Sequence, residues 1–336
     1  MRTVGQRVST SSLERPGDGI LVVGGPRMGT TWVAEALSHA EGAIWINEPD
    51  NEWPDPFALK AKLSLGRFPI LHETDPDPPA YLELWQRAFA GFHQSGLLHT
   101  LADRLENWER TRRDLWRALC DHANPRVALW LRVLVSLARP PSKRAAARLI
   151  VVKSVHSPLA LEWVASRVRP RVLVVLRHPF NTIASWLEFG WGGCYLDTHP
   201  KVRERFADPW GFPQLGEDRS LVAAVTWEVA LFTSVLRAAV QAHPDWLVIS
   251  HESVCSDPLV GFRKIYADLG LTWTKGVERF VRDSDRPGRG YETARVAADQ
   301  PDRWKHRLTR QQVEEIWQVL SRIRAPWVES LSRDQG

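Results

Sequence analysis

The sequence has only three cysteines in 336 residues, Cys120, Cys194 and Cys255, and they lie far apart. An odd number of widely spaced cysteines matches neither a disulfide framework nor a metal site, so we expect reduced thiols and no bound metal. No apolar run reaches the length that spans a membrane, and residues 1–6 lack the hydrophobic core of a signal peptide. These absences predict a cytoplasmic protein with no membrane partner.

Lysine is also scarce: only 8 of the 44 basic residues are lysines, and no long Lys/Arg run occurs. The net charge of +5 comes from 44 basic and 39 acidic residues, which is an ordinary solvated surface. We therefore expect no nucleic-acid partner. A length of 336 residues with 44% hydrophobic residues is sufficient for a large α/β core.

The most informative absence is that of a lysine from a phosphate-binding loop. Residues 20–32 read ILVVGGPRMGTTW, an apolar run that enters a glycine turn and then a helical stretch. Gly24 and Gly29 have the Walker A spacing, but Thr30 stands where nucleoside-triphosphate enzymes have lysine. Backbone N–H groups still form an anion cradle there, and the fixed charge lies on Arg27. The loop predicts a phosphate ligand other than a magnesium-bound triphosphate.

A second motif predicts another anion site. Residues 171–176 read RVLVVL, which is typical of a strand buried on both faces, and Arg177 follows directly. Pro179 suits the first turn of a helix, and Ser185 lies on that helix. Ligands of open α/β sheets bind at the edge where the strands end, so Arg177 is a candidate ligand residue.

Together, residues 26–32 and the pair Arg177 and Ser185 resemble the sulfotransferases that use 3′-phosphoadenosine 5′-phosphosulfate (PAPS). In that family a Pro-(Lys/Arg)-x-Gly-Thr-Thr-Trp loop holds the 5′-phosphosulfate. An Arg followed eight positions later by a Ser holds the 3′-phosphate. Residues 153–156 (KSVH) and 250–258 also resemble family segments, and the Arg in the loop is similar to that of the bacterial and carbohydrate-type branches.

The resemblance implies transfer of a sulfuryl group from PAPS to a hydroxyl of a small molecule or glycan, without a metal. The donor-binding residues that it implies are Pro26, Arg27, Gly29, Thr30, Thr31, Trp32, Arg177, Ser185, Arg289 and Arg295. Trp32 matches the residue that stacks on adenine, and a core tryptophan is the alternative. Arg289 and Arg295 stand where the cytosolic branch has an Arg-Lys-Gly segment, and an ordinary loop is equally consistent with them.

Sulfuryl transfer requires that the acceptor hydroxyl lose its proton and that the charge on the leaving oxygen be neutralised. Arg27 and Lys153 are the candidate cations. Glu48, after a strand at residues 43–46, and His156 are the candidate bases. One extra residue separates Lys153 from His156 relative to the Lys-Thr-His of the cytosolic branch, so we favour Glu48. Glu48 would need burial to raise its pKa toward neutrality.

Strands alternating with helices predict an α/β fold, with a central parallel sheet flanked by helices, and the resemblance implies the P-loop-like sulfotransferase fold in one domain over residues 1–336. Residues 1–18 are expected to form a loose tail. Residues 51–145 are expected to form a helical insertion, with helices at 81–92 and 97–119, that makes the acceptor wall. The remaining expected strands are 20–23, 149–152, 172–176 and 246–249.

Two other functions fit parts of the pattern. The first is a P-loop kinase or NTPase, against which stand Thr30 in place of lysine and the lack of a clear magnesium-binding Asp at a strand end. The second is a non-catalytic protein that binds a nucleotide or polyanion, which would not need both Glu48 and His156 beside the loop.

Overall fold

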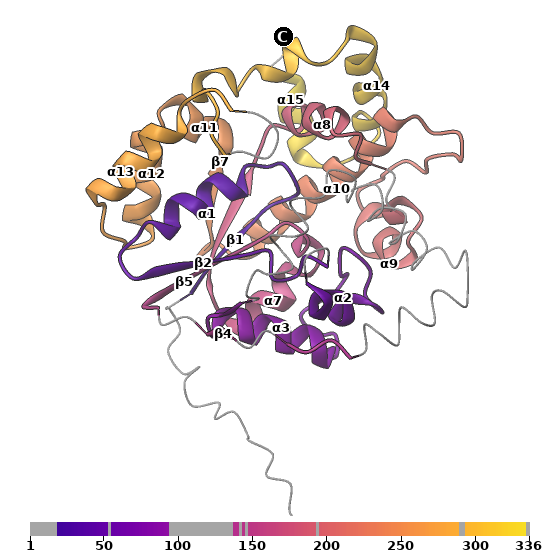
Figure 1. Ribbon diagram of the computed structural model, residues 1–336. Helices are drawn as coiled ribbons and strands as arrows, with labels where there is room; N and C mark the ends of the chain where they lie inside the picture. The colour runs from indigo at the N-terminus through magenta and orange to yellow at the C-terminus, as the bar shows by residue number, and fades with distance from the viewer. Residues whose placement is uncertain are drawn as a thin grey trace, which may run out of the picture.

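The computed structural model describes residues 19–52, 55–93, 137–140, 143–144, 147–192, 195–288 and 293–333. Within these residues a central five-stranded parallel sheet has the order β2-β5-β1-β6-β7 (Figure 1). The strands are β1 (Gly19–Val23), β2 (Ala43–Asn47), β5 (Leu149–Ser154), β6 (Arg171–Leu176) and β7 (Leu247–Ser250). The α/β fold with a parallel sheet is therefore confirmed, and each strand lies within two residues of its expected bounds.

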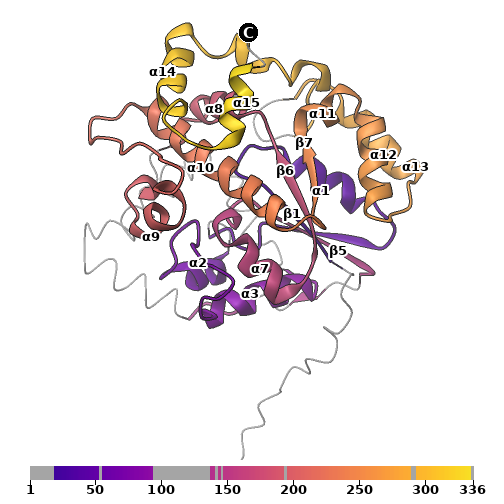
Figure 2. The same ribbon diagram turned by 180° about the vertical axis from the view of Figure 1, so that it is seen from behind.

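The sheet is buried on both faces, which explains the β-branched runs. Consecutive side chains of a strand point to opposite faces, so Leu21 and Val23 enter one hydrophobic cluster and Ile20 and Val22 the other. Figures 1 and 2 show the helices that cover each face. The first cluster contains residues of α2 (Pro56–Lys62), α3 (Pro79–Phe89), α7 (Leu161–Val168), α8 (Pro179–Glu188), α10 (Leu221–Ala242), α14 (Arg310–Leu320) and α15 (Pro326–Arg333). The second contains residues of α1 (Thr30–Ser38), α11 (His251–Ser256), α12 (Pro258–Asp268) and α13 (Lys275–Ser284).

Short elements complete the described chain. β3 (Phe92–His93) pairs antiparallel with β4 (Lys143–Arg144), and α9 is Pro200–Val202. A π-helical turn spans Arg203–Ala207, and 3₁₀ turns span Pro158–Ala160, Tyr195–Asp197, Ala297–Asp299 and Arg303–His306. The helix expected at 81–92 is present as α3, whereas the one expected at 97–119 and the tail at 1–18 lie outside the described residues.

Helix α10 is long and apolar enough to cross a membrane by length and composition, with a mean hydropathy of 1.5. The expectation that no apolar stretch reaches that length is therefore wrong. However, 78% of this stretch is buried inside the fold, and Trp227 and Phe232 on it are fully buried. Core helices of globular domains have this pattern of burial, because the surrounding elements cover their apolar surface.

Parallel pairing brings the carboxyl ends of all five strands to one edge of the sheet. The phosphate loop, residues 24–29, follows β1, and Glu48 follows β2. Lys153 is near the end of β5, Arg177 follows β6 and His251 follows β7. Because ligands of open α/β sheets bind at this edge, the fold itself gathers the candidate residues.

Candidate active site

The phosphate loop has a conformation that only glycine tolerates at position 29. Gly29 has a φ of +93°, and a Cβ atom added there would lie 2.2 Å from Cδ2 of His251. Gly29 is the N-cap of α1. Because glycine has no side chain to cap the helix, the first N–H groups of α1 face the loop. Thr30 and Thr31 are the first two helical residues and not the N-cap. Free N–H groups at a helix N-terminus are suited to an anion, so the anion cradle expected from the sequence stays a prediction that this geometry permits.

Hydrogen bonds join the phosphate loop directly to α8. The Arg27 side chain donates from Nε to Ser185 Oγ at 3.1 Å, and Arg177 Nη1 donates to the Arg27 carbonyl oxygen at 2.9 Å. Trp186 Nε1 donates to the Pro26 carbonyl oxygen at 2.8 Å. The two motifs lie about 150 residues apart in the chain, yet the structure makes them one unit.

Arg177 is a largely buried cation beside this unit, and its side chain is only 11% exposed. Burial lowers its pKa to about 10, and the charges of Arg27 and Arg307 act in the same direction. The Glu252 carboxylate, 4.0 Å from Arg177 Nε, opposes this shift. The guanidinium stays charged at neutral pH, so Arg177, Arg27 and Arg307 together favour an anionic ligand.

Arg307 is a candidate binding residue that the sequence motifs missed. It follows the 3₁₀ turn Arg303–His306 and pairs with Glu188 at the end of α8, with 2.8 Å between Nη1 and Oε2. The charges of Arg303 and Arg295 both act on its pKa. The basic composition of residues 303–307 was the only signal in the sequence, and it gave no indication that the segment packs beside α8.

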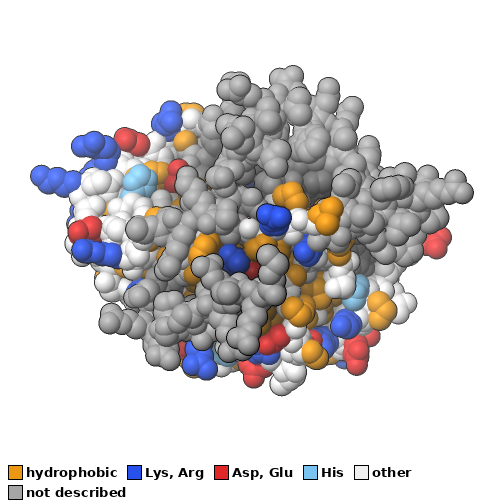
Figure 3. Space-filling model, turned by 60° about the horizontal axis from the view of Figure 1, so that its bottom comes forward, with side chains coloured by type: hydrophobic (Ala, Val, Ile, Leu, Met, Phe, Trp, Pro, Cys, Tyr) orange, Lys and Arg blue, Asp and Glu red, His pale blue; other side chains and the backbone are white. Residues whose placement is uncertain are grey.

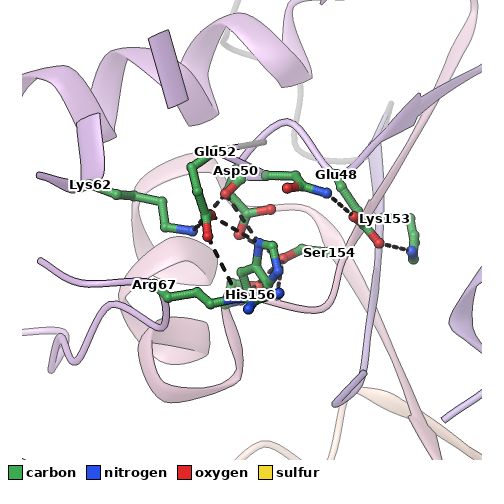
Figure 4. A network of polar contacts seen from close by, with 10 residues as sticks. Glu48, Asp50, Glu52, Lys62, Arg67, Lys153, Ser154 and His156 are labelled. Atoms are coloured by element: carbon green, nitrogen blue, oxygen red, sulfur yellow. Dashed lines mark hydrogen bonds and ion pairs between the residues drawn. The ribbon is translucent and has the colours of Figure 1, made fainter. Parts of the chain in front are cut away.

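Glu48 and Lys153 form an ion pair at the ends of adjacent strands. Figure 4 shows this pair at one side of a polar network, and Asn51 Nδ2 donates to the second carboxylate oxygen of Glu48 at 2.6 Å. Burial by itself raises the pKa of Glu48. The charge of Lys153 and these hydrogen bonds together outweigh burial and bring the pKa down to about 2. We expected a general base at this position to have a pKa raised toward neutrality. The pKa of Glu48 is lowered instead, because Lys153 stabilises the carboxylate.

His156 lies deeper than Glu48 and belongs to a different set of contacts. Its Nδ1 is 3.3 Å from the Asp50 carbonyl oxygen and 3.6 Å from Glu52 Oε2, and its ring packs edge-on against Phe68. The whole residue is 2% exposed. Burial lowers its pKa to about 3, and the charge of Lys62 acts in the same direction. His156 is therefore neutral at pH 7.

The side chains around His156 form a buried network that sequence reasoning did not predict. Ser154 Oγ donates to Asp50 Oδ2 at 2.7 Å and accepts the N–H groups of His156 and Ser157, each at 3.1 Å. Lys62 Nζ donates to the Asp50 carbonyl oxygen at 2.8 Å and pairs with Glu52 (Figure 4). The network fixes the turn after β5, which carries His156, against the segment after β2, which carries Glu48.

Three other predicted donor residues are placed as follows. Trp32 is 8% exposed, its Nε1 donates to Ser284 Oγ at 2.8 Å, and its ring packs on Phe262. It thus occupies a core position, which was the alternative to adenine stacking. Arg295 has its backbone N–H bonded to the Ser284 carbonyl oxygen, and Arg289 lies outside the described residues.

The predicted acceptor wall is described only in part, since residues 94–136 lie outside the described residues. Trp85 on α3 is fully buried and belongs to the core. A pocket of about 260 Å³ lies beside α7 and α10, and Leu71, Leu159, Phe206 and Val235 contribute to its lining. Figure 3 shows hydrophobic side chains gathered in the middle of one face, with Lys and Arg among them. In the described part of the chain no group of three His, Cys, Asp or Glu side chains could hold a metal ion.

Solved structures of sulfotransferases are similar to this chain. A sulfotransferase domain from the curacin biosynthetic pathway has a TM-score of 0.43 at 14% identity, covering 91% of this chain and 98% of that one. One from the Synechococcus PCC 7002 olefin synthase has a TM-score of 0.42 at 13% identity, covering 90% and 94%. Sulfotransferase STF9 from Mycobacterium avium has a TM-score of 0.40 at 15% identity, covering 93% and 78%.

No protein-family model matches the chain, and no curated protein matches it. At TM-scores below 0.5 and identities of 13–17%, the similarity to solved structures carries no conclusion about activity. The activity has to be inferred from the residues of this chain.

The low pKa of His156 predicts a pH dependence of stability. Between pH 3 and 6.5 the unfolded chain binds a proton at this histidine and the folded chain does not, so its contribution to the free energy of unfolding is complete above pH 6.5 and is lost as the pH falls toward 3. Urea unfolding of the wild type and of His156→Gln should show that the wild type loses about 2 kcal/mol more than the variant between pH 7.5 and pH 4.5. Equal losses would show that His156 is protonated in the folded protein.

Proposed function

We propose that the protein is a sulfotransferase that moves a sulfuryl group from PAPS to a hydroxyl of a small molecule or glycan. The observation that carries this proposal is the hydrogen bond from Arg27 Nε to Ser185 Oγ, at 3.1 Å. It brings two anion-binding elements together at the carboxyl edge of the sheet, with Lys153 and Glu48 at the end of a neighbouring strand pair. A nucleotide with phosphate groups at both its 3′ and 5′ positions suits two such elements better than a nucleotide phosphorylated at one position.

Two features of the described residues fit a bisphosphorylated donor. Glycine at position 29 leaves room for the ring of His251 against the loop, and the first N–H groups of α1 have no side-chain cap and are available to the 5′-phosphosulfate. Among the described residues, buried Nε of Arg177 has no hydrogen-bond acceptor, although Glu252 lies 4.0 Å away. A guanidinium with an unused donor is suited to a phosphate oxygen, and α8 carries both Ser185 and the carboxylate of Glu188 that pairs with Arg307.

The proposed reaction forms a bond from the acceptor oxygen to sulfur as the bond from sulfur to the 5′-phosphate oxygen breaks. The electron pair of the broken bond stays on adenosine 3′,5′-bisphosphate, where Arg27 and the loop N–H groups neutralise the new charge. The acceptor proton goes to Glu48, whose pKa rises from about 2 once Lys153, the cation that lowers it, turns from the carboxylate to the transferring group. Lys153, which pairs with Glu48 in this structure, is the second cation available to the transferring group.

Thermal unfolding with nucleotides tests the donor. Adenosine 3′,5′-bisphosphate at about 100 times its dissociation constant should add about 2.7 kcal/mol of stability without a divalent metal, whereas ATP with Mg²⁺ should add much less. Arg177→Ala should abolish most of the bisphosphate effect. Arg171→Ala is the matched control, because Arg171 begins the same strand at its opposite end and bonds to the Leu269 carbonyl oxygen. Stronger stabilisation by ATP with Mg²⁺ would favour the kinase or NTPase alternative.

Single-turnover assays test the base. Glu48→Gln keeps the shape of the side chain but cannot take the proton, so sulfuryl transfer should slow by about 10²–10⁴, with bisphosphate affinity nearly unchanged. His156→Asn should cost much less, because a neutral histidine inside the network only orients its neighbours. The opposite ranking would assign the proton to His156, and comparable losses would indicate that the two residues act as a coupled pair.

A further inference from the structure

One buried amide lies at the junction of three separate segments near Arg177. Asn181, in the first turn of α8, is 2% exposed. Its Nδ2 donates to Glu252 Oε1 at 3.1 Å and to the Pro301 carbonyl oxygen at 2.8 Å, and its Oδ1 accepts the N–H of Trp304 at 3.1 Å. Both donor hydrogens and the acceptor are used, so the side chain is held in one orientation.

The segment that Asn181 binds continues into Arg307. Pro301 and Trp304 bond to Asn181 in the first turn of α8, and Arg307 pairs with Glu188 at the end of α8. The segment therefore contacts both ends of the helix. The Trp304 ring also packs on Phe180, with 4.8 Å between ring centroids. Residues 301–307 are thus attached along α8, and the ion pair with Glu188 places Arg307 one helical turn from Ser185.

Glu252 connects the same amide to the Arg177 turn. Besides accepting from Asn181, Glu252 Oε1 accepts the N–H of His178 at 2.9 Å, and it lies 4.0 Å from Arg177 Nε. A single carboxylate oxygen therefore joins α11 to the turn after β6, and Asn181 extends this connection to residues 301–304. None of these side-chain hydrogen bonds of Asn181 goes to Arg177 or Arg307.

We propose that Asn181 is a positioning residue that fixes residues 301–307 along α8 and so holds Arg307 near Ser185 for the 3′-phosphate of the nucleotide. This inference rests on the proposed function. Its physical basis is that Arg307 is long and can adopt many rotamers, so its use as a phosphate ligand depends on the backbone that carries it. Asn181 binds that backbone at two points and requires no contact with the ligand.

Nucleotides with and without the 3′-phosphate separate this role from a merely structural one. In calorimetry, Asn181→Ala should weaken binding of adenosine 3′,5′-bisphosphate about 10-fold or more, since a charge-assisted phosphate contact is lost, and should change binding of adenosine 5′-monophosphate about 2-fold or less. Thr182→Val is the matched control: Thr182 is fully buried next to Asn181, and its hydroxyl makes only a long bond of 3.5 Å to the His178 carbonyl oxygen. It should leave both affinities unchanged. Equal weakening of both nucleotides by Asn181→Ala would overturn the inference.

A double variant and an exchange measurement complete the test. If Asn181 acts through Arg307, then Arg307→Ala should weaken bisphosphate binding in the wild type and have little further effect in Asn181→Ala. Additive losses would contradict the inference. Without any nucleotide, the Trp304 amide hydrogen, which Asn181 Oδ1 accepts, should exchange faster in Asn181→Ala than in Thr182→Val, and equal exchange would contradict the attachment itself. Failure of the wild type to bind the bisphosphate would instead refute the proposed function, and this inference with it.

Discussion

The candidate site depends on the parallel pairing of β1 with β5 on one side and β6 on the other. Val22 stands opposite Lys153, and Val23 stands opposite Ser154 and Val174. The three strands therefore end at nearly the same level, and the phosphate loop emerges between the segments that carry Lys153 and Arg177. Fixed charges from distant parts of the chain reach one place because backbone hydrogen bonds set the register, not because the side chains attract one another.

Burial decides which of these charges are paired within the protein and which is suited to a ligand. Lys153 and Glu48 stabilise each other, and so do Lys62 and Glu52 beside His156. Removing one member of a buried pair leaves the other charge without a partner, which costs far more than an exposed ion pair contributes. Arg177 differs from these residues, since the nearest carboxylate to it in the described part of the chain, that of Glu252, is 4.0 Å away. The site therefore contains paired charges that fix its shape and a cation suited to a ligand.

The short motifs predicted two candidate anion-binding elements that the fold does bring to one edge of the sheet, and each could be found in the sequence because it is local. The conformation at Gly29 depends on adjacent residues, and Arg177 and Ser185 lie on one strand and the helix that follows it. The pKa of Glu48 could not be found in this way. Its low value comes from Lys153, which is 105 residues away in the chain and adjacent only through the pairing of β2 with β5.

The sequence by itself determined the strands, the glycine loop with its arginine and the helix after Arg177, because hydrophobic periodicity and turn chemistry act over a few residues. Only the tertiary structure decided that Trp32 packs in the core, that His156 is enclosed by Asp50, Glu52 and Lys62, and that Asn181 connects α8 to residues 301–304. Each of these outcomes depends on contacts between segments far apart in the chain. Such contacts leave no periodic or local pattern, since they are formed only when the sheet and its helices pack together.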